Sequence, residues 1–321
     1  MTVTNATPQD LPAMIALLKQ SLGENLIPKS EGFFVWKHYQ NPFGPSKVLL
    51  AREGERVIGL RAFMYWSWVS GREQIRAVRA VDTATDPAHQ GKGIFRKLTM
   101  QAVDECKQEG VGLVFNSPNP ISMQGYLKMG WKQAGKMPIC LKPGSIFPRL
   151  FKEGAENDLL EPYRVDQAIS PIGHRAFDET KGAPWHTALS KEYLQWRYHD
   201  CPVVQYGAIA QPGAYGFVFR LKRVNRFYEL RICEAWTEKN DPAILREARR
   251  GLSGIVRKIR PLMVSYADSV TFMDGQSRPG RFFGPYPKGP MVTIRPLALE
   301  NLDHFESFHH WKPSMGTMEL F

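Results

Sequence analysis

A glycine-rich turn between two apolar segments offers the clearest chemistry in this sequence. Residues 81–85 have the composition of a strand, residues 86–93 form a turn, and residues 94–109 repeat apolar side chains at helical spacing. Glycines in such a turn let backbone N–H groups approach a phosphate, and the start of the helix adds a partial positive charge. Lys92 and Arg96 bring full positive charges to the same end. The stretch therefore predicts a site for a phosphorylated ligand.

The spacing of the glycines excludes two common nucleotide sites. Neither the G-x-x-x-x-G-K-[ST] loop of nucleoside triphosphatases nor the G-x-G-x-x-G turn of dinucleotide folds is present here. Instead, Gln90-Gly91-Lys92-Gly93-Ile94-Phe95 resembles the Q/R-x-x-G-x-G/A loop of the GNAT superfamily of N-acetyltransferases. The resemblance implies that this loop and Arg96 hold the pyrophosphate of acetyl-CoA. The sequence departs from the family at Phe95, where Gly or Ala is preferred, and the effect of this ring stays open.

A second segment resembles the same family. After a buried-strand run at 111–115, Asn119 precedes Tyr126 by seven residues, and the segment closes with Lys128, Gly130 and Trp131. The resemblance implies that Asn119 belongs to the cofactor site and that Tyr126 protonates the leaving thiolate. A phenol with a pKa near about 10 suits a thiolate with a pKa of about 8 to 9. The alternative is a tyrosine that only packs.

The strand before the loop is expected to line the cofactor. The resemblance implies that an exposed edge near Thr83, Ala84 and Thr85 hydrogen-bonds the pantetheine arm, and that an amide there stabilises the oxyanion. Asp82 is the nearest acidic residue and therefore the candidate general base. Strand alternation places Asp82 and Ala84 on one face and Thr83 and Thr85 on the other. If Asp82 faces away from the cofactor, it is structural, and an ordered water carries the proton.

Length and an internal repeat indicate two domains. A chain of 321 residues is long for a single core. The segment 33–42, with Trp36-Lys37, recurs at 193–202 as Trp196-Arg197. Extended runs, a helix at 242–260 and a strand follow in the order seen in the first half, which favours duplication.

We therefore expect an α/β (α+β) fold of two tandem GNAT-like domains, each a central mixed, mostly antiparallel sheet flanked by helices. The expected ranges are 1–142 for the catalytic domain, 143–160 for a linker and 161–321 for the second domain. The second domain lacks the glycine loop, because the corresponding connection, 237–242, contains Glu238 and Asp241 and no glycine. One coenzyme A per chain is the expectation.

Composition limits the compartment and the partners. The net charge of +11 is spread over both halves and favours anionic ligands, but neither zinc-finger spacing nor an arginine-rich arm supports nucleic acid as a partner. No apolar run reaches the roughly 18 residues that a membrane helix needs, so no membrane partner is expected. Four scattered cysteines favour reduced core residues in a cytoplasmic protein. His304, His309 and His310 match no metal motif, and no metal is expected.

These observations lead to one main functional hypothesis. The chain is expected to be an N-acetyltransferase that transfers acetyl from acetyl-CoA to a primary amine by direct attack. The acceptor stays open between a protein lysine, an aminosugar, a polyamine and a small metabolite amine, as do the role of the second domain and a homodimeric state. Two alternatives remain: an aminoacyl-tRNA-dependent transferase of tandem GNAT type, and a non-catalytic acetyl-CoA-binding regulator.

Overall fold

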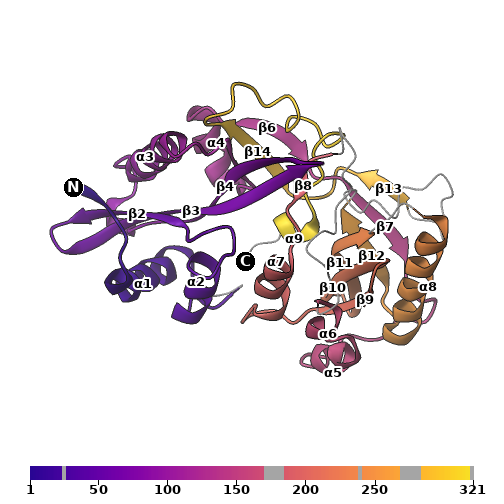
Figure 1. Ribbon diagram of the computed structural model, residues 1–321. Coiled ribbons are helices and arrows are strands. Elements are labelled where there is room, and N and C mark those ends of the chain that lie inside the picture. The colour runs from indigo at the N-terminus through magenta and orange to yellow at the C-terminus, as the bar shows by residue number, and fades with distance from the viewer. Residues whose placement is uncertain (24–26, 170–183, 238–240, 268–282, 319–321) are drawn as a thin grey trace.

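Two mixed β-sheets, each flanked by helices, make up the computed structural model of this chain (Figure 1). It describes residues 1–23, 27–169, 184–237, 241–267 and 283–318. The α/β architecture with two sheets expected from the sequence is confirmed.

The first sheet is built around an antiparallel meander. Its order is β1-β2-β3-β4-β5-β14-β6, and β8 pairs with β3 beyond this path. All neighbours are antiparallel except β4 and β5, which are parallel. The strands of this sheet are β1 (Thr2–Asn5), β2 (Lys47–Glu53), β3 (Arg56–Ser70), β4 (Glu73–Thr85), β5 (Leu113–Asn116), β6 (Lys132–Lys136), β8 (His186–Thr187) and β14 (Met291–Pro296).

Helices cover both faces of the first sheet. On one face, α1 packs against β3 and β4 with four buried side chains, Met14, Ile15, Leu17 and Leu18. On the other, α3 does the same with its apolar stripe, and Gly59 of β3 permits the approach because a Cβ there would lie 2.5 Å from Ile94. The helices of this half are α1 (Leu11–Leu22), α2 (Glu31–His38), α3 (Ile94–Gln108) and α4 (Pro120–Lys128).

The second sheet repeats this plan. Its order is β13-β7-β12-β11-β10-β9, with β11 and β12 parallel, as β4 and β5 are. The predicted helix at 242–260 is α8, which packs on β10 and β11. The elements of this half are α5 (Glu156–Leu160), α6 (Val165–Ile169), α7 (Lys191–Leu194), a π-helical turn (Gln195–His199), α8 (Pro242–Ile259), β7 (Ile139–Pro143), β9 (Gly207–Gln211), β10 (Tyr215–Val224), β11 (Phe227–Thr237), β12 (Met263–Ala267) and β13 (Phe283–Tyr286).

The two halves exchange a strand. β7 follows β6 in the chain but pairs with β12 of the second sheet, while β14 follows β13 but inserts between β5 and β6 of the first. The two inserted strands occupy corresponding positions, next to the strand that follows the long helix. The ranges 1–142 and 161–321 remain predictions about folding units, whereas the sheets themselves draw on both ranges.

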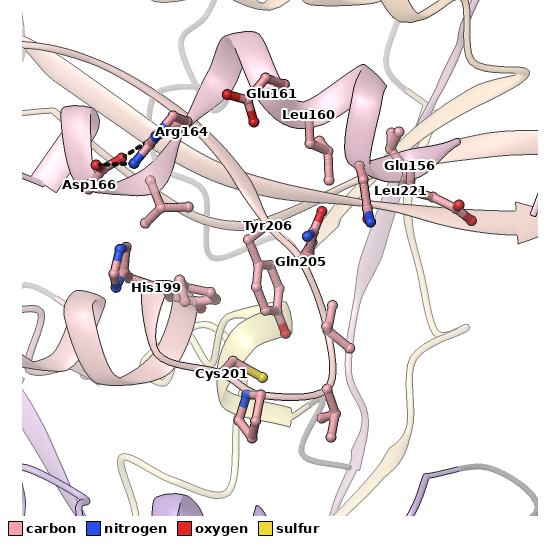
Figure 2. A pocket seen from close by; sticks show the side chains of 16 residues that line it. Glu156, Leu160, Glu161, Arg164, Asp166, His199, Cys201, Gln205, Tyr206 and Leu221 are labelled. Carbon is pink, nitrogen blue, oxygen red and sulfur yellow. Dashed lines mark hydrogen bonds and ion pairs between the residues drawn. The ribbon is translucent and has the colours of Figure 1, made fainter. Parts of the chain in front are cut away.

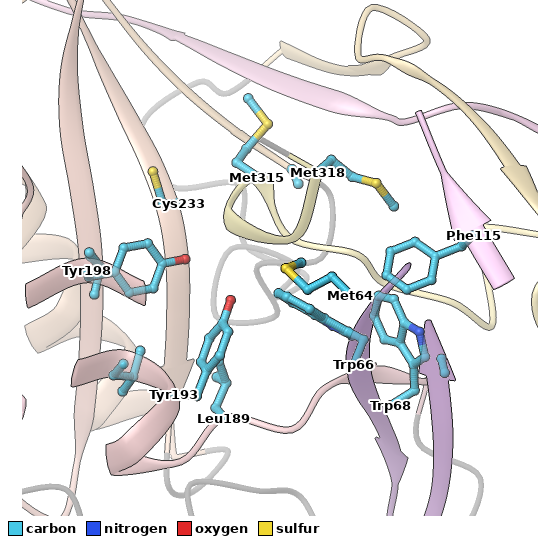
Figure 3. Packing of buried hydrophobic residues seen from close by; sticks show 14 of the residues in the cluster. Met64, Trp66, Trp68, Phe115, Leu189, Tyr193, Tyr198, Cys233, Met315 and Met318 are labelled. Carbon is cyan, nitrogen blue, oxygen red and sulfur yellow. The ribbon is translucent and has the colours of Figure 1, made fainter. Parts of the chain in front are cut away.

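A shared aromatic core joins the sheets. Figure 3 shows Met64, Trp66 and Trp68 of β3 facing Tyr193 and Tyr198 of the second half, with the short helix α9 (Met315–Met318) above them. Trp311 is fully buried in the same cluster, so the aromatic segment around it packs into the core. The halves therefore share one interior and do not meet at a polar linker.

Two sequence expectations can be compared directly with the described ranges. The four cysteines are free and buried, as predicted. Within these ranges, no helix combines the length and the apolar character needed to span a bilayer.

Candidate functional site

The predicted phosphate loop lies on the surface at the N-terminal end of α3. Gly91 and Gly93 both have φ of 76°, a conformation that favours glycine, and a Cβ on either would meet nothing within 4 Å. Gly93 is the N-cap of α3, and the first helical bond runs from the amide of Lys97 to its carbonyl over 3.0 Å. The amides of residues 94–96 therefore have no acceptor within the helix and point out of its positive end.

The sheet opens next to this loop. β4 pairs with β5 only from Ala77 to Arg79, and residues 80–85 of β4 have no strand partner on that side among the described residues. Thr83, Ala84 and Thr85 thus lie on the open stretch that the sequence assigned to the pantetheine arm. On its other edge, β4 pairs with β3, and a bulge places Val81 and Asp82 opposite Ala62.

Asp82 is held by two neighbouring side chains of α2. Lys37 Nζ donates to its carboxylate over 2.9 Å and His38 Nε2 over 2.7 Å, while the Ser46 hydroxyl donates to His38 Nδ1 over 3.0 Å. Burial favours a raised pKa for Asp82, but Lys37 and His38 outweigh it and hold that pKa well below its usual range. Burial lowers the pKa of His38, so the imidazole stays neutral. Asp82 and Ala84 share the face covered by α1 and α2, as strand alternation predicts.

Tyr126 lies on α4, across the opening from β4. Its ring packs edge-on against Phe95 at 5.4 Å and against Trp131 at 5.2 Å, and its hydroxyl has no hydrogen-bond partner among the described residues. Asn119 caps α4, because its side-chain oxygen accepts from the amide of Ser122 over 2.8 Å. The side chain of Asn119 thereby fixes the start of the helix that carries Tyr126.

The ring of Phe95 occupies space that a Gly or Ala would leave open. It contacts Tyr126, and a Cβ added at Gly125 would lie 3.0 Å from it. The ring thus packs in the space between α3 and α4, while the Phe95 amide remains at the helix start.

Arg61 is the residue of this region that the sequence reasoning missed. It lies on β3, its side chain is fully buried, and none of its three guanidinium nitrogens has a hydrogen-bond partner in the described structure. Its Cζ lies 4.8 Å from the ring centre of Phe63, 5.4 Å from that of Tyr126 and 5.8 Å from that of Phe95. The available signal was a single charged residue within the apolar strand Val57–Met64.

These features fit acetyl-CoA. The glycine backbone leaves an open cradle, the helix start supplies free amides, and Lys92 and Arg96 are exposed beside it. The unpaired edge of β4 can accept an extended amide chain. The guanidinium of Arg61 has no hydrogen-bond acceptor among the described residues. Gln90 is exposed at the entrance of the loop, and Ile94 anchors the helix by its buried side chain.

A separate cavity of about 660 Å³ lies in the second half (Figure 2). Glu156, Glu161 and Asp166 line it, and Arg164 is paired with Asp166 over 2.9 Å. This cavity is formed by α5, α6 and the segment 198–206, far along the molecule from α3 and α4 (Figure 1). It is therefore not the site formed by the loop.

Two further sequence features concern the second half and the tail. Within the connection at 237–242, Glu238 and the two residues that follow it lie outside the described residues. Asp241 caps α8, because its side-chain oxygen accepts a hydrogen bond from the amide of Ala243. His304, His309 and His310 are exposed, and the described residues contain no group of three metal-ligating side chains.

Comparison with known proteins finds a family match for the segment that contains this loop. A family model described as an acetyltransferase (GNAT) domain matches residues 2–134. A GCN5-related N-acetyltransferase from Anabaena variabilis superposes with a TM-score of 0.60 at 12% identity, covering 92% of this chain and 72% of that one. A probable N-acyltransferase from Enterococcus faecalis gives 0.61 at 9% identity, with 94% and 74% covered. A GCN5-related N-acetyltransferase from Kribbella flavida gives 0.57 at 12%, with 92% and 71% covered.

The structural likenesses concern the fold, and they extend over both sheets. No curated protein matches the sequence. The family match over residues 2–134, which include the whole strand–loop–helix unit around Gly91 and Gly93, identifies this segment of the chain as similar to an acetyltransferase (GNAT) domain.

Proposed function

We propose that this protein transfers the acetyl group of acetyl-CoA to a primary amine. The observation that carries the proposal is the pair of left-handed glycines, Gly91 and Gly93, at the start of α3 and beside the unpaired edge of β4. A strand edge, a phosphate cradle and a helix terminus in this order suit a ligand with an extended amide chain and a pyrophosphate.

Three groups of residues would hold the cofactor. The amides around Gly91 to Phe95 would bind the pyrophosphate, with Lys92 and Arg96 adding charge. Gln90 and Asn119 lie at the ends of the two connecting segments, where they would border the ligand. The edge of β4 at Thr83, Ala84 and Thr85 would hydrogen-bond the pantetheine amides, and one of these amides would stabilise negative charge on the carbonyl oxygen.

Bound there, acetyl-CoA would supply an activated thioester. Tyr126 would give its proton to the departing sulfur, since it lies on α4 and its hydroxyl has no hydrogen-bond partner among the described residues. The edge contact with Phe95 fixes the plane of its ring. Phe95 would have to share the slot with the pantetheine arm, and we propose that its ring forms one wall of that slot.

Water is the best candidate to take the proton from the attacking amine. Asp82 is the nearest carboxylate, but its low pKa and its bonds to Lys37 and His38 make it a weak base. We propose that Asp82 orients α2 against β4 at the bulge.

The second half would contribute structure to this site. Arg295 of β14 donates to the carbonyl of Met129 and lies 5.2 Å from the ring of Trp131, so the exchanged strand supports the end of α4. We propose that the second half shapes the acceptor side and binds no cofactor of its own.

Calorimetric titration of coenzyme A into the whole protein tests the proposal. We expect one site per chain; two sites, or none, would contradict it. Acetyl-CoA turnover with a panel of amines then separates an enzyme from a protein that only senses acetyl-CoA. Mass spectrometry of a cell extract fed with labelled acetyl-CoA would identify the class of acceptor.

A further inference from the structure

Arg61 carries a charge that the protein itself does not neutralise. Its side chain is fully buried, and its Nε and both terminal nitrogens lack hydrogen-bond partners in the described part of the chain. A guanidinium has five N–H donors, and leaving them unpaired in a buried position is strongly unfavourable. Aromatic rings around it offer cation–π contacts, which compensate only part of this loss.

The position of Arg61 indicates where a partner for its guanidinium would lie. Arg61 lies directly opposite Thr83 in the β3–β4 ladder, so both side chains are on the face covered by α3 and α4. Its guanidinium also contacts the ring of Tyr126, which belongs to the helix beyond β5. A side chain that starts on β3 and reaches α4 must cross over the opening between β4 and β5.

The duplicated half provides an internal comparison. The β10–β11 ladder has a bulge at the place that corresponds to the bulge in the β3–β4 ladder. On the same side of these bulges, Phe217 pairs with Ala235 in the second half and Arg61 pairs with Thr83 in the first. The residue that corresponds to Arg61 is therefore an apolar phenylalanine in the second half, where the strand–helix connection at 237–242 has no glycine. The charge at Arg61 occurs in the half with the phosphate loop, which associates it with the ligand.

We propose that Arg61 binds the sulfur of coenzyme A and stabilises it as the leaving thiolate. This inference rests on the proposed function. The amine nitrogen forms a bond to the carbonyl carbon, the carbon–sulfur bond breaks, and its electron pair stays on sulfur. The guanidinium stabilises this charge until the proton of Tyr126 reaches the sulfur; the proton released by the amine passes to solvent, and Tyr126 regains one from there.

Binding of coenzyme A and of desulfo-coenzyme A, which lacks the sulfur, tests this role without turnover. The wild-type protein should bind coenzyme A at least about tenfold more tightly, as expected for a charge-assisted interaction. In Arg61→Met the two ligands should bind with equal affinity, with desulfo-coenzyme A unchanged. Arg250→Met, which removes an exposed charge on α8, is the control and should keep the wild-type ratio.

The melting temperature of the free protein gives a second test. Replacing an arginine with a purely structural role would lower this temperature, whereas replacing a ligand-binding Arg61 should raise it. Arg61→Met removes a buried charge without breaking a hydrogen bond, so the free protein should melt at a higher temperature than wild type. A lower melting temperature would overturn the proposal, as would equal weakening of both ligands or an unchanged ratio. If wild type binds neither ligand, the proposed function itself fails.

Discussion

Trp36 and Trp196 donate the same hydrogen bond to each other. The indole Nε1 of each lies 2.7 Å from the backbone carbonyl oxygen of the other. Their rings stack with centres 5.3 Å apart and planes 22° apart. These are the two tryptophans of the sequence repeat, so the repeated segments meet about a local two-fold relationship. The observation links the duplication in the sequence to the contact between the halves.

Replacing either tryptophan by Phe should destabilise the protein by about 1–3 kcal/mol, because a buried carbonyl loses its donor. Chemical denaturation of Trp36→Phe, Trp196→Phe and the double variant measures this. Trp68→Phe is the matched control, since the Trp68 indole N–H is buried without a partner in the described structure. Equal losses in all three single variants would assign the effect to ring size rather than to the exchanged bonds.

The exchanged strands should prevent residues 1–142 from folding alone. Without β14, the strands β5 and β6 lose the neighbour between them, and an unpaired edge promotes aggregation. Co-expression with residues 143–321 should restore a soluble complex, as judged by size-exclusion chromatography and circular dichroism. A folded, monomeric 1–142 fragment would argue for an independent first domain.

Substituting Gly91 and Gly93 together by Val should remove the stabilisation that coenzyme A provides. For the wild type this stabilisation is about 2.7 kcal/mol at a ligand concentration of 100 Kd. The control is Gly213→Val, because Gly213 has φ of 70° and equally open surroundings but lies in the β9–β10 turn. A thermal shift that persists in the double variant would exclude this loop from the cofactor site.

Tyr126→Phe should lower kcat by about 10²–10⁴-fold while the affinity for coenzyme A stays near that of wild type. The ring contacts with Phe95 and Trp131 remain, so folding should be preserved. Tyr65→Phe removes a hydroxyl that donates to Glu109 and serves as the control. Full activity of Tyr126→Phe would leave the residue with a packing role only.

Stability should fall as the pH decreases from about 7 to 5. Burial lowers the pKa of His38 below its ordinary value of 6.5, so the unfolded chain takes up a proton that the folded protein does not. His38 alone can contribute at most about 1.4 kcal/mol per pH unit. Asp82, whose pKa is also lowered, adds a further loss only below about pH 4.

Denaturation of His38→Gln at several pH values checks this assignment. A glutamine amide can still donate to Asp82 but does not titrate, so the difference between pH 7 and 5 should shrink. An unchanged pH dependence would assign the acid sensitivity to other groups.

Several elements of this fold depend mainly on neighbouring residues and could be predicted from the sequence. Glycine spacing gave the left-handed turn at Gly91 and Gly93, and apolar periodicity gave α3 almost to its last residue. The helix at 242–260 and the repeated Trp36 segment were also readable. Each of these patterns reflects local backbone geometry, which residues close in sequence control.

Only the tertiary structure decided which distant groups meet. The bonds of Asp82 to Lys37 and His38 span 45 and 44 residues, and the Thr293 hydroxyl donates to Asn116 across 177 residues. The alternation in β4 indicated the face of Asp82 but not its partners. The place of β14 in the first sheet depends on which edge of β5 remains open after packing. Arg61 is readable as a charge in an apolar strand, but its lack of a partner depends on three rings from three different elements.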